Sequence, residues 1–236
     1  MTQSGRGQAK PKLMDRRDFL TAKKPNATLH NTATPVVFFR TNSGINQYTG
    51  PWTKNEVQHL LKRTMFGSTK ADIDYFLAKT MIQAIDELIN PTAPFPAPPV
   101  NDYSPGTADA NIVAGATCIN NPTSDGTLNS VRRSCFKKWW TCGMIKQDRS
   151  IREKITLFWA NHFGTETTDI NNAHYVYRHH NLLRQNGLGN FKQLVKDITV
   201  DTGMLVYLNG YLNTAAAPDE NYGRELQELF TIGKDP

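Results

Sequence analysis

The chain has 236 residues, of which 39% are apolar and 20% charged, so it can form a hydrophobic core and is neither wholly disordered nor fibrous. No apolar run approaches the roughly 20 residues that a membrane helix needs, and the sequence therefore predicts no transmembrane segment. Its three cysteines are odd in number and form no Cys-x-x-Cys pair, which argues against a disulfide framework and against a cysteine–zinc site.

The net charge of +6 is concentrated at the N-terminus, because residues 1–30 carry +5 and the rest of the chain only +1. We therefore interpret residues 1–50 as a basic tail, disordered or extended, and not as part of a nucleic-acid-binding face. Arg16 and Arg17 resemble the start of a twin-arginine export signal, but the apolar segment that must follow such a signal is absent. The sequence thus leaves the compartment unassigned.

Residues 51–90 have the pattern of a small layer of three helices. Thr53, Thr69 and Thr80 each stand where a helix is expected to begin, because a threonine hydroxyl can accept a hydrogen bond from the first free N–H groups. Three short helices also occur in DNA-binding helix-turn-helix modules. The third helix here carries two acidic residues and no cation, which disfavours that alternative.

Residues 91–129 interrupt the helical pattern with seven of the 13 prolines, and they show no sustained periodicity. A long irregular insertion of this kind is usually either functional or flexible.

Residues 130–236 are predicted to form the main helical bundle, one domain with residues 51–90 and truncated at its C-terminus. Capping residues and glycine stops place helices after Ser150, Asn172, Asn190 and Pro218. No alternating strand pattern is present. The predicted fold is therefore mostly α, an irregular multi-helix bundle with a long Pro-rich insertion and a basic tail.

Polar side chains on apolar helix faces are the candidate functional residues. On a helical wheel of residues 151–163, His162 lies within the apolar stripe and Glu153 on the opposite, polar side. In the last helix Glu225 lies among apolar side chains, and in the helix after Asn172 both His179 and Asn186 do so. A buried imidazole or carboxylate needs a partner, so we expect His162 and Glu225 to meet across neighbouring helices.

This arrangement allows several interpretations. As an enzyme site, His162 would be a base or ligand, Glu225 an acid/base group or ligand, and Arg224 an anion or carboxylate clamp. Glu228, with His162 and Glu225, could instead hold a divalent metal, although the spacing matches no known ligand motif. In a purely structural interpretation, each of these groups, including His179 and Asn186, is a satisfied buried polar residue.

Several segments of the chain together resemble a bacterial family known as domain of unknown function 1800. The most specific are Trp159-Ala160-Asn161-His162-Phe163 and the run from Glu220 to Gly233, and the resemblance covers about residues 53–233. Two positions depart mildly from the family pattern, which has Ala at Gly223 and Asn at Asp219. The resemblance implies a longer bacterial protein, often exported and often encoded beside a sulfatase-like protein, with no established activity.

We therefore predict an envelope-associated or exported hydrolase that uses the His/Glu site. A sulfatase-like partner is implied by the resemblance only. The alternative is a non-enzymatic helical scaffold that binds a partner protein or polymer through residues 91–129. A DNA-binding helical module is the second alternative.

Overall fold

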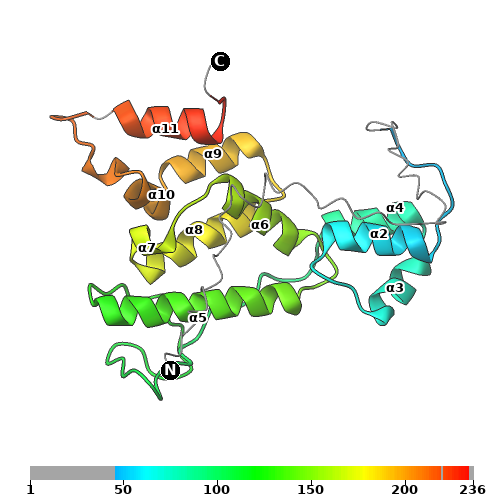
Figure 1. Cartoon of the computed structure of the whole chain (residues 1–236), viewed down its shortest axis with the longest axis horizontal. Coiled ribbons are helices and arrows are strands. Elements are labelled where there is room, and N and C mark those ends of the chain that lie inside the picture. The colour runs from blue at the N-terminus through cyan, green and yellow to red at the C-terminus, as the bar shows by residue number, and fades with distance from the viewer. Residues whose placement is uncertain (1–45, 219, 234–236) are drawn as a thin grey trace, which may run out of the picture. The chain divides into compact units, whose positions relative to one another are not determined.

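The computed structural model describes residues 46–218 and 220–233, nearly all of which belong to one compact unit, Thr49–Pro236 (Figure 1). Among these residues there are α-helices, one 3-10 helix and no strand, which confirms the mostly α prediction. The elements are α2 (Lys54–Thr64), α3 (Lys70–Leu77), α4 (Met81–Ile89), α5 (Gly126–Ile145), α6 (Arg152–His162), α7 (Thr167–Ile170), α8 (Ala173–Asn186), α9 (Phe191–Thr199), α10 (Thr202–Tyr207), η1 (Gly210–Leu212) and α11 (Glu220–Phe230). The predicted basic tail and its Arg-Arg pattern lie outside the described residues, apart from residues 46–50.

The layer of three short helices forms as the sequence predicts. The hydroxyls of Thr53, Thr69 and Thr80 each accept a hydrogen bond from the backbone of the helix that follows, α2, α3 and α4 respectively. Apolar side chains on the inner faces of these helices pack into their own cluster, in which Phe76 and Leu88 are fully buried. Local capping and an apolar stripe are therefore enough to specify this part of the fold.

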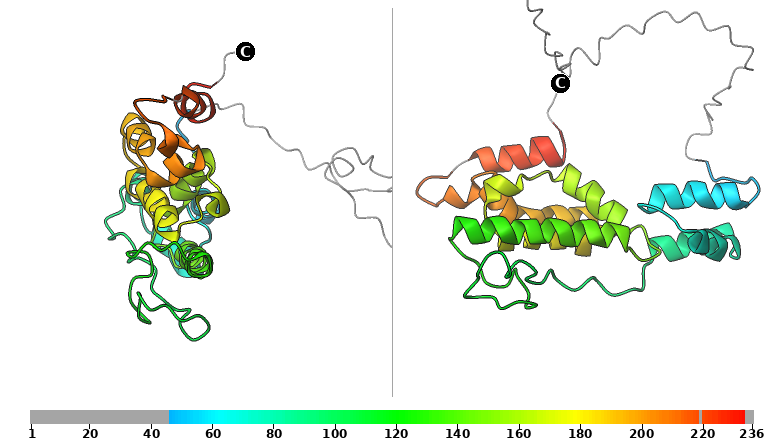
Figure 2. Two further views of the ribbon diagram at one scale, coloured as in Figure 1. Left: turned by 90° about the vertical axis from the view of Figure 1, so that its left-hand side faces the viewer. Right: turned by 60° about the horizontal axis from the view of Figure 1, so that its bottom comes forward.

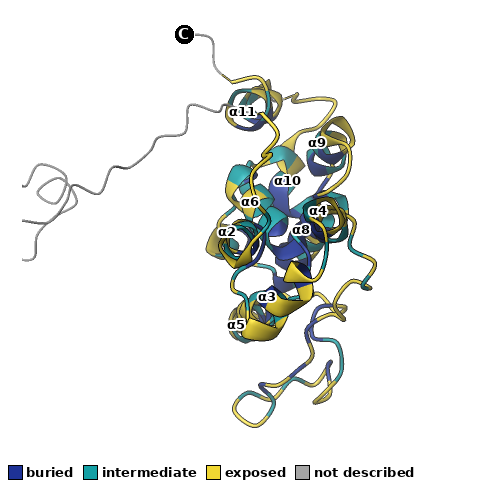
Figure 3. Cartoon of the chain, turned by 90° about the vertical axis from the view of Figure 1, so that its right-hand side faces the viewer, coloured by how far each residue is buried: buried dark blue, intermediate teal, exposed yellow. Residues whose placement is uncertain are grey.

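The central element of the remaining bundle is α8, which contacts α5, α6, α7, α9 and α10. In Figure 3 it is the dark blue helix in the middle of the unit, surrounded by half-exposed neighbours. As predicted, its N-terminus is capped by Asn172, whose side chain accepts from the His174 N–H. Because partners surround α8, even its polar side chains are removed from solvent, and these include His179, His180 and Arg184.

Helix α6 differs from its prediction in how it is rotated about its own axis. The Ser150 hydroxyl accepts from the Arg152 N–H at 3.3 Å, but the expected capping box is incomplete because Glu153 turns inward. Glu153 is 4% exposed, whereas Phe158, which shares the apolar stripe of the helical wheel with His162, is 53% exposed. The buried Glu153 carboxylate meets Arg184 of α8, and this ion pair, not the apolar stripe, decides which face of α6 is covered.

Helix α5 begins at Gly126, inside the range predicted to be irregular, and Asp125 caps it by accepting from the Leu128 N–H. We call residues 91–125 the insertion. Figure 2 (right) shows the insertion running alongside α5, and Trp139 of α5 donates from Nε1 to the Ala97 carbonyl at 2.8 Å. The insertion is therefore attached to the bundle along the length of α5. None of the helices in the described ranges is both long and apolar enough to cross a membrane.

Candidate functional site

A cavity of about 250 Å³ lies beside α8, where α5 and α6 pack against it. Aromatic and aliphatic side chains form most of its wall, and hydroxyl, amide and imidazole groups form the rest. The lining residues are Phe136, Trp140, Leu157, Ala160, Asn161, Thr165, Thr167, Val176, His179, His180 and Leu183. The pocket is partly open to solvent, and a mostly apolar wall with a few polar groups is the usual form of a small-molecule site.

His179 is held in the cavity wall by Asp201. Its Nδ1 lies 2.8 Å from Asp201 Oδ2, and the two side chains are only 6% and 4% exposed. Asp201 caps α10, because the same oxygen accepts from the Met204 N–H at 2.9 Å. A carboxylate that accepts at Nδ1 fixes the proton on that nitrogen, so neutral His179 keeps a lone pair on Nε2. That Nε2 is buried and finds no hydrogen-bond partner among the described residues.

Gly203 lies close to both His179 and Asp201, which we call the His179–Asp201 dyad. A Cβ atom at Gly203 would lie 2.9 Å from His179 Cβ and 3.0 Å from Asp201 Oδ2. The first distance is shorter than real Cβ contacts, and the second requires the carboxylate to move by a few tenths of an ångström. Glycine is therefore the residue that lets α10 pack against the imidazole and its carboxylate at the same time.

His180, the next residue, has the opposite hydrogen-bonding pattern. Its Nδ1 lies 3.3 Å from Arg184 Nη1, which can only donate, so Nδ1 accepts and the proton of neutral His180 is on Nε2. Burial, and next the positive charge of Arg184, lower the pKa of His180 well below 6.5. The ring contacts Trp140 edge-on, with centroids 4.1 Å apart. The His180 Nε2 and Trp140 Nε1 atoms are both buried donors without a partner among the described residues.

A buried ion pair between Arg184 and Glu153 orients the group that donates to His180. Arg184 donates from Nε and Nη2 to the two carboxylate oxygens of Glu153, at 3.0 and 2.8 Å. This bidentate geometry fixes the guanidinium plane, which in turn fixes the donor that faces His180. Glu153 and Arg184 thus set the hydrogen-bonding state of a side chain in the cavity wall.

The residues predicted to be catalytic or metal-binding lie elsewhere. His162 is half-buried at the end of α6, where its Nε2 donates to the Phe230 carbonyl at 2.7 Å. Glu225 is not buried as the wheel suggested: its side chain is 27% exposed. It contacts Arg224, which also lies 3.6 Å from Glu228. No hydrogen bond or ion pair within the described ranges joins His162 to Glu225.

The other predicted groups have different environments. His179 is in the core, as described above, whereas Asn186 is half-buried and its amide donates to the Leu182 carbonyl one turn back in α8. Nowhere in residues 46–218 and 220–233 do three or more His, Cys, Asp or Glu side chains form a group that could hold a metal ion. The predicted set of His162, Glu225 and Glu228 is therefore not gathered into such a group.

Sequence comparison assigns most of this unit to a family. Residues 59–236 match the model of a family described as a protein of unknown function, DUF1800. The match includes every residue that lines the cavity. No curated protein and no solved structure matches the chain.

Proposed function

The chain belongs to the DUF1800 family, and on this premise we propose that it is a hydrolase with His179 as the general base in the cavity beside α8. One observation carries the proposal: a buried imidazole held at Nδ1 by Asp201, with its other nitrogen unpartnered among the described residues. Leaving a buried polar atom unsatisfied costs about 1–3 kcal/mol, and such atoms concentrate at functional sites.

The geometry supports a division of roles between the two histidines. His179 Nε2 carries a lone pair and can take a proton from a water molecule, while Asp201 stabilises the imidazolium that forms. His180 Nε2 and Trp140 Nε1 carry protons and can donate to an oxygen on which negative charge develops. An acceptor and two donors on side chains that line one small pocket are the groups that addition of water to a polar bond requires.

The depressed pKa of His180 suits the donor role. A histidine that stays neutral at pH 7 donates from Nε2 without adding a charge to the cavity, and Arg184 keeps that tautomer in place. An envelope or extracellular polymer stays the predicted substrate class on the strength of the family resemblance alone. The catalytic roles predicted for His162, Glu225 and Arg224, and the metal role of Glu228, also stay predictions.

Hydrolysis of chromogenic esters, glycosides and phosphate esters by the full chain tests the proposal. His179→Gln and Asp201→Asn should each lower kcat by about 100-fold or more, because each removes or misorients the base. His59→Gln is the matched control, since His59 is exposed on α2 and its loss should leave kcat unchanged. An activity that survives His179→Gln but is lost in His162→Gln would move the site to the residue predicted from the sequence.

A second measurement does not depend on finding a substrate. ¹⁵N NMR of the imidazoles should show His179 protonated at Nδ1 and His180 protonated at Nε2 near pH 7. A proton on His179 Nε2 would remove the base from the cavity and refute the mechanism. Correct tautomers together with no turnover of any substrate class would favour the alternative function, a helical scaffold that binds a partner protein or polymer.

A further inference from the structure

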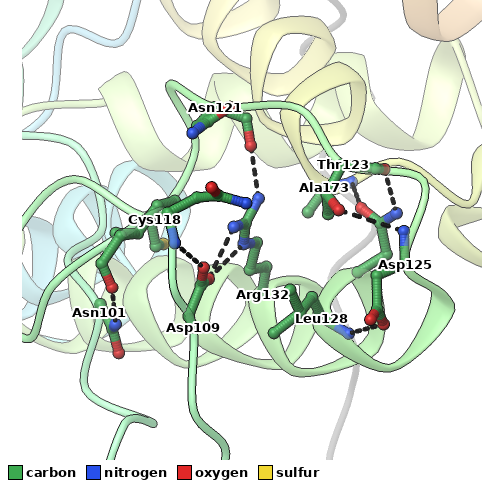
Figure 4. Close-up of polar contacts among 12 residues, drawn as sticks. Asn101, Asp109, Cys118, Asn121, Thr123, Asp125, Leu128, Arg132 and Ala173 are labelled. Carbon is green, nitrogen blue, oxygen red and sulfur yellow. Dashed lines mark hydrogen bonds and ion pairs between the residues drawn. The ribbon is translucent and has the colours of Figure 1, made fainter.

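The insertion is attached to one face of α5. Arg132, Cys135 and Trp139 are three and four residues apart, so they lie along the same side of the helix. Figure 4 shows Arg132 between Asp109 and Asn121 of the insertion; its Nη2 lies 2.6 Å from Asp109 Oδ2, and it also donates to the Asn121 carbonyl. A segment of irregular backbone is thus held by a regular row of side chains.

The middle position of this row is a cysteine next to another cysteine. The Sγ atoms of Cys118, in the insertion, and Cys135, in α5, lie 3.4 Å apart. Both side chains are buried in the apolar cluster that also contains Phe136, whereas the third thiol, Cys142, is exposed. The sequence spacing gave no reason to pair these two cysteines, but the fold brings them together.

We propose that Cys118 and Cys135 are a disulfide-forming pair that links the insertion covalently to α5 when the chain folds in the presence of a disulfide oxidant. The reaction is thiol–disulfide exchange. One cysteine thiolate attacks a small oxidised disulfide, such as oxidised glutathione, and releases one glutathione thiol; the second cysteine then displaces the other. Two protein thiols are oxidised to one disulfide, and one glutathione disulfide is reduced to two thiols.

Burial decides when this reaction can occur. In the folded chain neither sulfur is accessible to a small disulfide, and the contact with Cys135 together with burial raises the pKa of the Cys118 thiol. The same contact lowers the pKa of the Cys135 thiol, so it is the lack of access, and not the pKa, that slows exchange, which requires an accessible thiolate. The bond therefore forms during folding, while the insertion is still settling on α5, and resists reduction afterwards.

The link has a measurable effect on stability. A disulfide between residues 118 and 135 closes a loop of 18 residues and restricts the unfolded chain. For a domain of this size the expected rise in Tm is about 6–12 °C. Because Phe136 follows Cys135 and lines the cavity, the same link fixes one wall of the proposed site.

The test uses the full chain with Cys142→Ser, which removes the exposed thiol that could cross-link two molecules. After refolding with oxidised and reduced glutathione, alkylation in denaturant should find no free thiol, and peptide mapping should recover a fragment pair joined through Cys118 and Cys135. The reduced form should melt about 6–12 °C lower than the oxidised form. The matched control, Cys118→Ala with Cys142→Ser, should show one Tm whatever the redox buffer.

Two results would overturn the proposal. The first is a natively folded protein, by circular dichroism, that retains two alkylatable thiols after refolding with the oxidant. The second is a disulfide that forms but leaves Tm equal in the oxidised and reduced protein, since such a bond would not constrain the insertion. If Cys118→Ala prevents folding, Cys118→Ser replaces it and the same two measurements apply.

Discussion

Replacing Asp109 by Asn should destabilise the protein strongly, although the change removes only one charge and no volume. Asp109 accepts from Arg132 Nε at 3.0 Å and Nη2 at 2.6 Å, and the two side chains are 0% and 2% exposed. An amide can still accept one hydrogen bond, but the guanidinium then stays charged in a buried site without a counter-charge. Breaking a buried pair in this way costs about 3–5 kcal/mol.

The same two segments offer an exposed pair as a matched control. Lys138 of α5 lies 3.5 Å from Asp102 of the insertion, with side chains 63% and 50% exposed. Solvent screens this pair, so Asp102→Asn should cost no more than about 1 kcal/mol. At about 2–4 °C per kcal/mol for a chain of this length, Asp109→Asn should lower Tm by about 6–20 °C and Asp102→Asn by less than about 4 °C.

Urea unfolding measures the free energy of unfolding of both variants and calorimetry measures their Tm. The pH dependence of stability is an independent check. Burial opposes ionisation of Asp109, but the hydrogen bonds from Arg132 and Tyr103 outweigh it and hold the pKa of Asp109 below 3.8. The ion pair therefore stabilises the protein fully above that value and is lost as pH falls through the lower, folded-state pKa. If Asp109→Asn and Asp102→Asn lower the free energy of unfolding equally at pH 7, burial does not determine how much each ion pair stabilises the protein, and the argument is wrong.

Two further predictions concern the candidate site. Gly203→Ala should destabilise the protein by about 1–3 kcal/mol in urea unfolding and lower kcat in any assay that depends on His179, because the new methyl group displaces the imidazole or Asp201; unchanged stability and activity would show that the contact relaxes freely. The pKa of His180 is lowered in the folded protein, so below pH 6.5 this side chain is protonated in the unfolded chain and stays neutral in the folded chain. Stability should therefore fall from pH 6.5 towards pH 5 by up to about 1.4 kcal/mol per pH unit, and the His180→Gln variant should lose this component; an identical slope in both proteins would contradict it.

Helix beginnings could be predicted from the sequence because the interactions that make them are local. Thr53, Thr69, Thr80, Asn172 and Asn190 each accept from an N–H two or three residues later, so the signal is contained in a short window. The mostly α fold follows from these caps and from the apolar periodicity between them. Ends are less well specified: the last helix stops at Phe230, before the glycine at position 233 that could serve as its stop signal.

Which face of α6 is buried could not be predicted, because it depends on a residue that is distant in the sequence. A helical wheel ranks positions by polarity, and it places Glu153 towards solvent. Arg184 is 31 residues away, and nothing in the local pattern shows that this cation neutralises the carboxylate in the core. Once the pair is buried, the covered face of α6 rotates, and His162 moves to a half-buried edge where a backbone carbonyl satisfies it.

The His179–Asp201 dyad was missed for a related reason. His179 was recognised as a polar group on an apolar face, but its partner follows 22 residues later, across the whole of α9. Asp201 carries only a local signal, that of a cap before α10, and this signal says nothing of a second partner. The spacing of His180 and Arg184, one helical turn apart, is a second local signal for the site that the sequence contains.

Stability alone does not account for the side chains of α8. Arg184 is neutralised by Glu153, and His179 is oriented by Asp201, so each of these polar groups has a counterpart that offsets its burial. The Nε2 atoms of His179 and His180 have none among the described residues, and leaving both unsatisfied costs about 1–3 kcal/mol each. An aliphatic side chain in place of His180 would avoid that cost, whereas one in place of His179 would leave the buried Asp201 carboxylate without its imidazole partner. The proposed function accounts for a core that retains two adjacent imidazoles, one a proton acceptor and one a donor.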